Sequence, residues 1–133
     1  MSQENVEIVR AAFDAFDRGD MEGVLRLCDD NIEITQPAEL PGVSRHQHGH
    51  AGVREAFAIW PEQWDDFRVE MQRVDDMGDH VMVTTRQRGR GKDSGAEVET
   101  YFTFLFSIRA GKIADWRIFM REAEALEAAR LRE

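Results

Sequence analysis

A long alternation of side-chain types over residues 97–108 constrains the fold more than any other feature of the sequence. The even-numbered positions are mostly apolar: Val98, Thr100, Phe102, Phe104, Phe106 and Ile108. The odd-numbered positions are mostly polar: Glu97, Glu99, Tyr101, Thr103 and Ser107. Because successive side chains of a strand point to opposite faces, this pattern predicts one long strand with three phenylalanines on a single face.

The segment before residue 30 carries helical periodicity instead. Apolar residues recur at three- and four-residue steps in a first amphipathic helix: Val6, Val9, Phe13 and Phe16. Arg18-Gly19 ends this helix, and Asp20 stands at the N-cap of a second, shorter one. The apolar stripe of the second helix consists of Val24, Leu25 and Cys28.

The remaining elements follow from alternation and from turn residues. Residues 31–36 predict a short strand, and Pro41-Gly42 predicts a loop after it. A third helix begins near Val53 and is stopped by Pro61. Strands are predicted at 67–74, 80–90 and 112–120 around the long one, and a short helix closes the chain. We therefore expect one α+β domain over residues 1–133, with helices covering one face of a strongly curved antiparallel sheet.

Composition excludes several classes of function. The 133 residues carry a formal charge of −9, which repels nucleic acid and anionic lipid. Cys28 is the single cysteine, so an intrachain disulfide is impossible and a reducing compartment is expected. An acidic N-terminus and the lack of an apolar run of about 18 residues argue against a signal peptide and a membrane span. We expect a cytoplasmic protein without nucleic-acid or membrane partners.

Three segments carry a family resemblance: "FDAFDRGDMEGVLRLCDDNIEI", "GHAGVREAF" and "AGKIADWRIF". In their order and spacing they resemble the nuclear transport factor 2-like superfamily, and within it the SnoaL-like group. The resemblance implies a cone-shaped fold, a bent sheet over helices with a pocket inside, and a homodimer formed through the outer sheet face. Its members include ketosteroid isomerases, polyketide cyclases, epoxide hydrolases, a dehydrochlorinase and proteins that only bind, so the fold alone selects no chemistry.

The resemblance does not transfer the catalytic groups of the isomerases. The position of their oxyanion-binding tyrosine falls at Ala12, which cannot donate a hydrogen bond. The position of their carboxylate base falls at Gln36, which cannot accept a proton at neutral pH. The position of their protonated aspartate falls at Phe102 or Thr103. Isomerisation of the steroid type is therefore not expected.

The same correspondence with the family implies a pocket whose lining differs from that of the isomerases. It directs three side chains of residues 80–90 toward the concave face, namely Thr84, Arg86 and Arg88, and makes Trp60 a cap at one end. The other implied lining residues are Gln36, Phe102, Phe104 and Trp116. A desolvated arginine in an aromatic cavity would favour an anionic or enolisable ligand. The alternative is that Arg86 and Arg88 point outward and pair with Glu97 and Glu99, since a one-residue change of register exchanges the two faces.

A cluster of histidines, "RHQHGHAG", has two interpretations. On a strand, His46, His48 and His50 would face one way and could hold a metal ion. Because Gly49 and Pro41-Gly42 indicate a loop, we expect no metal site there. The resemblance places His50 in the first turn of the third helix, where a neutral imidazole could act as a general base or simply bond its own loop.

Together these features predict a cofactor-free pocket protein for a small, mostly apolar ligand. As an enzyme it would catalyse an isomerase, cyclase, lyase or hydrolase reaction, with Arg86 stabilising negative charge and His50 as the base. The alternative is a non-catalytic ligand-binding or protein-interaction dimer.

Overall fold

The computed structural model describes residues 2–40 and 44–131, apart from the side chains of residues 2, 59–63 and 131. The described helices are α1 (Ser2–Asp17), α2 (Met21–Arg26), α3 (Gly49–Gln63) and α4 (Glu122–Leu131). The described strands are β1 (Cys28–Thr35), β2 (His46–His48), β3 (Trp64–Asp76), β4 (His80–Gly91), β5 (Glu97–Arg109) and β6 (Lys112–Phe119).

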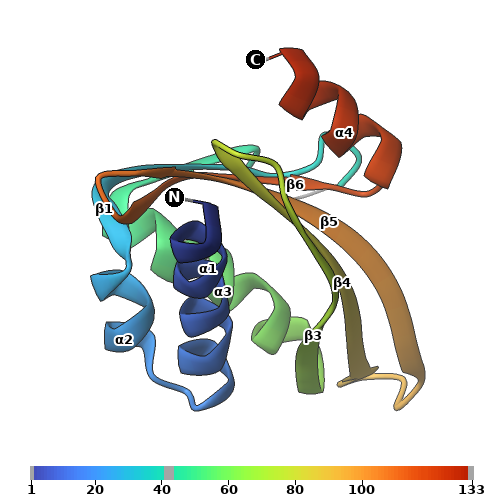
Figure 1. Cartoon of the computed structure of the whole chain (residues 1–133). Helices are drawn as coiled ribbons and strands as arrows, with labels where there is room; N and C mark the ends of the chain where they lie inside the picture. The colour runs from blue at the N-terminus through green and yellow to red at the C-terminus, as the bar shows by residue number, and fades with distance from the viewer. Residues whose placement is uncertain (1, 41–43, 132–133) are drawn as a thin grey trace.

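The strands form one bent sheet in the order β2-β1-β6-β5-β4-β3. Helices α1 and α3 lie inside the bend, with α2 beside them, whereas α4 lies on the opposite side of the sheet (Figure 1). This arrangement confirms the predicted α+β cone. In the described part of the chain, no helix is both long and apolar enough to cross a membrane.

The connection between the first two helices forms as the sequence predicts. Gly19 has a φ of 72°, a left-handed conformation that glycine adopts without strain. The N–H of Asp20 bonds the carbonyl of Ala15 at 2.8 Å and closes the end of α1. The Asp20 side chain then accepts a hydrogen bond from the N–H of Gly23 at 2.9 Å, which caps α2.

Helix α2 is shorter than predicted, and Cys28 begins β1 instead of extending the helical stripe. The reason lies in a distant strand. The carbonyl of Leu27 accepts a hydrogen bond from the N–H of Ile113 at 2.8 Å, so the chain joins β6 as soon as the helix ends. Cys28 remains buried, as the apolar periodicity indicated.

The segment 46–48, predicted as a loop, is a short strand that pairs antiparallel with β1. The structure also contains one parallel pair, β1 with β6, in a sheet predicted to be antiparallel. Both differences place extra strands at one edge of the meander β3–β6, which itself is antiparallel throughout. The predicted loop at Pro41-Gly42 lies outside the described residues.

Helix α3 continues to Gln63 and passes Pro61, where the sequence predicted its end. A proline disturbs a helix less in its last turn than in its interior, because little of the helix remains after it.

The two faces of the sheet bury different cores. On the concave side, residues of α1 and α3 pack with a core whose largest members come from the strands, among them Ile34, Phe104 and Phe106. On the convex side, Met82 and Leu105 pack against Ala125 and Ala129 of α4. Helix α4 therefore covers one part of the convex face and leaves the rest of β4 and β5 uncovered (Figure 1).

Candidate functional site

A cavity of about 70 Å³ lies between the helices and the concave face of the sheet. It has room for several water molecules or a comparable organic group. Its lining comes from α1, α2, α3 and every described strand except β2. The cavity therefore occupies the position that the resemblance implied for a pocket.

Aromatic side chains form one wall of this cavity. The Trp116 ring lies 5.3 Å from the rings of both Phe57 and Phe104, measured between centroids. Phe13 stacks on Phe104 at 6.1 Å. These separations are typical of packed aromatic pairs, which hold each ring in one orientation. The wall therefore offers flat, rigid apolar surfaces.

The polar groups of the lining are few and mostly neutral. Gln36 and Gln87 are both buried, and Gln36 donates from Nε2 to Oε1 of Gln47 at 3.1 Å. Cys28 is the one ionisable side chain among the lining residues that the structure describes. Burial raises the pKa of its thiol to about 11, against the smaller opposing effect of Lys112, so the thiol is neutral at physiological pH.

Four of the predicted pocket residues line the cavity: Gln36, Phe102, Phe104 and Trp116. At the three positions transferred from the isomerases, the cavity presents Ala12, Gln36 and Phe102, since Thr103 lies on the opposite face of β5. The predicted cap Trp60 falls among the side chains that the structure does not describe.

The prediction that Thr84, Arg86 and Arg88 face the cavity is wrong. In β4 the inward-facing residues are Val81, Val83, Thr85 and Gln87, which pair with Phe106, Phe104, Phe102 and Thr100 of β5. The three predicted residues alternate with these and therefore point to the convex face.

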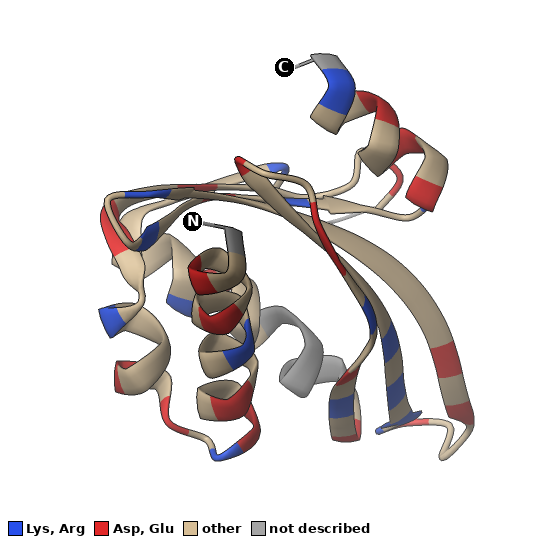
Figure 2. Ribbon diagram, viewed as in Figure 1, with Lys and Arg blue, Asp and Glu red and all other residues tan. Residues whose placement is uncertain are grey.

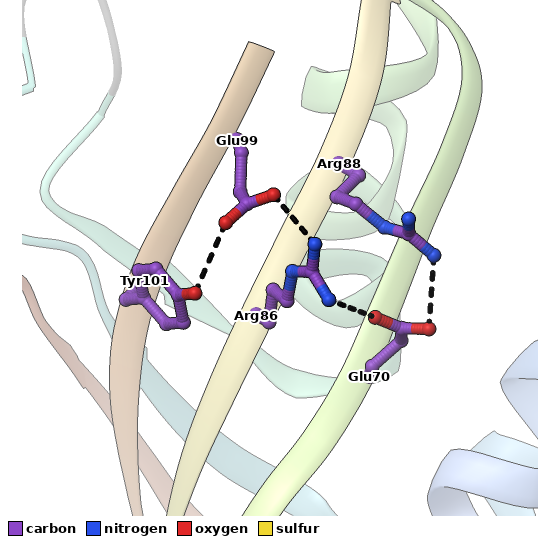
Figure 3. Close-up of polar contacts among 5 residues, drawn as sticks. All are labelled: Glu70, Arg86, Arg88, Glu99 and Tyr101. Atoms are coloured by element: carbon purple, nitrogen blue, oxygen red, sulfur yellow. Dashed lines mark hydrogen bonds and ion pairs between the residues drawn. The ribbon is translucent and has the colours of Figure 1, made fainter.

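The two arginines face outward, as the alternative interpretation expected, but only Arg86 pairs with one of the two carboxylates that it named, since Arg88 pairs with Glu70 of β3. Arg86 donates from Nη2 to Oε2 of Glu99 at 2.7 Å, and Arg88 donates from Nη2 to Oε2 of Glu70 at 3.1 Å (Figure 3). Tyr101 donates from its hydroxyl to the other oxygen of Glu99 at 3.0 Å. We call these five residues, Glu70, Arg86, Arg88, Glu99 and Tyr101, the convex network.

Hydrogen bonding within the convex network shifts the pKa values of Arg86, Glu99 and Tyr101. The hydrogen bond from Arg86, followed by that from Tyr101, lowers the pKa of Glu99. The same bond to Glu99 raises the pKa of Arg86, and the phenol of Tyr101 is likewise held protonated with a raised pKa. These groups are therefore fixed in their ordinary charge states and are unsuited to proton transfer near neutral pH.

His50 lies in the first turn of α3, as predicted, but outside the cavity lining. Its Nε2 donates to the carbonyl of Cys28 at 3.1 Å and lies 3.6 Å from Oδ1 of Asp30. His50 therefore bonds a backbone carbonyl, as the alternative expected, but this carbonyl belongs to β1 and not to the histidine's own loop.

His46 and His48 both lie exposed on β2. Nδ1 of His48 contacts Oε1 of Glu33 at 2.8 Å. Among the described residues, no group of three or more His, Cys, Asp or Glu side chains is arranged to hold a metal ion.

Gln87 is the site residue that the sequence did not identify. It occupies the face of β4 opposite to the arginines, and its amide oxygen Oε1 is buried without a hydrogen-bond partner among the described residues. The signal available in the sequence was the charge pattern: Glu97 and Glu99 were predicted to face outward, and the arginines beside them in the next strand are stabilised by facing the same way.

Comparison with known proteins places this geometry in a family. The model of the SnoaL-like domain matches residues 9–116. No functionally curated protein matches the sequence.

Several solved structures share the fold. A nuclear transport factor 2-like protein of unknown function from Burkholderia pseudomallei K96243 is 21% identical, with a TM-score of 0.80 over 93% of this chain and 95% of that one. TerC, co-crystallised with polyporic acid, is 22% identical, with a TM-score of 0.79 over 96% and 98% of the two chains. A nuclear transport factor 2-like protein from Burkholderia xenovorans LB400 is 26% identical, with a TM-score of 0.75 over 97% and 98%.

The family match covers most of the chain and includes the second half of α1, the aromatic wall and both cavity glutamines. On this ground the chain belongs to the family of SnoaL-like domains, within the nuclear transport factor 2-like superfamily.

Proposed function

We propose that this protein binds a small, uncharged, mostly apolar molecule in the cavity of the cone and does not transform it. The observation that carries the proposal is the chemistry of the described lining, which combines an aromatic wall with two glutamines and one neutral thiol. General acid–base catalysis needs a group that gains or loses a proton near neutral pH. Gln36 and Gln87 cannot do so, and the high pKa of Cys28 keeps its thiol protonated.

Neither of the two residues that the sequence analysis considered as catalytic groups, Arg86 and His50, lines the cavity. Arg86 pairs with Glu99 on the convex face, so it cannot stabilise negative charge in the cavity. The co-crystal of TerC with polyporic acid supports a small-molecule role for this fold without naming the ligand of this chain.

Two neighbouring alanines of α1 provide a matched test of cavity binding. Ala12 lines the cavity, whereas Ala11 is exposed on the other side of the helix. Ala12→Phe should fill the space with a ring, and Ala11→Phe adds the same ring to the solvent face. Butylbenzene, a neutral hydrocarbon, serves as the probe, and its binding is measured as an increase in melting temperature.

We expect butylbenzene to raise the melting temperature of the native protein and of Ala11→Phe, but not of Ala12→Phe. No increase in the native protein, or an equal increase in both variants, would refute binding in the cavity. Conversion of a small neutral compound into product, abolished by Ala12→Phe, would show that the protein is an enzyme after all.

We also propose that this protein forms a homodimer, in which two copies of the chain bind each other through the uncovered part of the convex face. Figure 2 shows basic residues along β4 beside acidic residues at the start of β5. The basic row is Arg86, Arg88 and Arg90, and the facing row is Glu97, Glu99 and Tyr101. A two-fold axis parallel to the strands, between β4 and β5, would place each basic row over the acidic row of the other copy.

Sedimentation velocity tests this dimer. We expect a dimer at low salt that dissociates as salt rises, because its contacts are mostly ionic. Glu99→Lys should give a monomer, while the control Glu7→Lys, an exposed position on α1, should leave the dimer intact. A native protein that is monomeric at every concentration and salt tested would refute the proposal.

A further inference from the structure

Two polar side-chain atoms of the described cavity lining lack a hydrogen-bond partner: the acceptor Oε1 of Gln87 and the donor Nε1 of Trp116. Gln87 lies on the concave face of β4, where its neighbours across the sheet are Val69 of β3 and Thr100 of β5. Its side chain is 4% exposed. Because Oε1 has no partner among the described residues, the folded protein retains a buried acceptor without a hydrogen bond.

A chain of hydrogen bonds fixes which end of the Gln87 amide is free. The hydroxyl of Thr85 donates its single hydrogen to the carbonyl of Phe102 at 2.8 Å. Thr85 can therefore only accept from Gln87, whose Nε2 lies 3.4 Å from Oγ1 of Thr85. This assigns Nε2 to the side of Thr85 and leaves the acceptor, Oε1, on the other side of the amide.

The second glutamine of the cavity is oriented by the same logic. The carbonyl of Ser44 accepts from Nε2 of Gln47 at 2.7 Å, which turns Oε1 of Gln47 toward Gln36. Gln36 must then present Nε2 to that oxygen, at 3.1 Å. In both cavity glutamines, neighbouring residues therefore engage the amide N–H group.

From this geometry we infer that the ligand of the cavity carries an O–H or N–H group that donates a hydrogen bond to Oε1 of Gln87. The ligand class is a neutral donor with an apolar body, such as a phenol, an alcohol or an amide. This inference rests on the proposed function. It reverses the expectation from the sequence, because a carboxylate or phenolate would place negative charge against an acceptor oxygen instead of an arginine.

Three compounds with one apolar body test the inference on the native protein: butylbenzene, 4-butylphenol and 4-butylacetophenone. Dissociation constants are measured by titration calorimetry. We expect the phenol, which can donate, to bind about tenfold more tightly than the hydrocarbon. The ketone can only accept, so Oε1 of Gln87 gives it no advantage over the hydrocarbon; tighter binding of the ketone would have to come from the donor Nε1 of Trp116.

Two variants show whether Gln87 causes this preference. Gln87→Met removes the acceptor at similar length, so the phenol should lose its advantage while butylbenzene binds as before. Thr85→Val removes the hydroxyl that holds Nε2, so the amide is free to turn, and the ketone should gain relative to the phenol. Unchanged binding of butylbenzene demonstrates in each variant that the cavity has folded.

The outcomes separate this inference from the function on which it rests. Equal affinity of the native protein for phenol and hydrocarbon, or a phenol preference that survives Gln87→Met, overturns the role of Gln87 and leaves cavity binding standing. If none of the three compounds binds, the proposed function and this inference are both overturned.

Discussion

The neutrality of the Cys28 thiol gives the sharpest quantitative test of the cavity. Cys28 is the single cysteine of the chain and lines the cavity, so alkylation reports on one site there. The thiolate is the form that reacts. Because burial raises the pKa from 9.0 to about 11, we predict that folding strongly protects this cysteine.

The magnitude follows from the fraction of thiolate at pH 8. With a pKa of 9.0, about one thiol in ten is ionised, whereas with a pKa of about 11 the fraction is about one in a thousand. Ionisation alone therefore slows alkylation about a hundredfold. Since Cys28 is only 6% exposed, restricted access should slow it further.

Iodoacetamide labelling followed by mass spectrometry measures the effect. The native protein is compared with the same chain in concentrated urea, where the pKa returns to its ordinary value. Between pH 8 and pH 10 the native rate should rise about tenfold per pH unit, because the pH stays below the raised pKa. In the unfolded chain the rise should level off above about pH 9.

Two further comparisons strengthen the design. Lys112 lowers the pKa of Cys28, so Lys112→Met should slow labelling of the native protein still more. Saturation with butylbenzene should slow it as well if the ligand occupies the cavity beside Cys28. Equal rates in the folded and unfolded chains at pH 8 would refute the burial argument, and with it the neutral lining.

Three other predictions concern stability and the convex face. Asp20→Ala should lower the free energy of unfolding in urea by about 1 kcal/mol, because α2 loses the N-cap that bonds Gly23; an unchanged value would contradict that bond. Leu105→Ala should lower it by about 2–5 kcal/mol, since the fully buried leucine packs under α4, while Val98→Ala, at a half-exposed position, should change it by less than about 0.5 kcal/mol. Arg86→Gln should leave the affinity for butylbenzene unchanged, and a clear loss would revive the sequence hypothesis that Arg86 faces the cavity.

The long strand was predictable because each of its faces has one environment over most of its length. Phe102, Phe104 and Phe106 face the helices, and Glu97, Glu99 and Tyr101 face outward. In a strand of this kind, the alternation of apolar and polar residues predicts which face is buried. The alternation placed Phe102 and Phe104 on one face without knowledge of any other strand, and the family resemblance implied that this face lines a pocket.

At the start of β4 the two faces of the strand do not differ in environment. Val81 is buried against the concave core, and its neighbour Met82 is buried under α4 on the convex side. With both faces covered, the alternation vanishes there, and only pairing with β5 decides the orientation. The structure pairs Arg86 with Tyr101, whereas the predicted pocket requires Arg86 opposite Phe102. A difference of one residue in the turn after Gly91 therefore separates the correct assignment from the wrong one.

The short strand β2 could not be predicted for a different reason. Its three residues are too few to show a pattern, and it exists only because β1 offers an edge for pairing. The parallel contact of β1 with β6 joins segments some eighty residues apart in sequence. The residue pattern within one short segment does not predict pairing with a segment so far away in the sequence.

The electrostatics of the two faces explain why the observed orientation of β4 is the stable one. In the cavity, an arginine would be desolvated, and no carboxylate is available among the lining residues that the structure describes. A buried charge without a partner is strongly destabilising. On the convex face, Arg86 keeps part of its hydration and bonds Glu99. The same orientation of β4 leaves Gln87, whose side chain is a neutral acceptor, on the concave face. The orientation that places the arginines on the convex face therefore leaves the described cavity lining without an arginine, and for this reason we expect a neutral ligand.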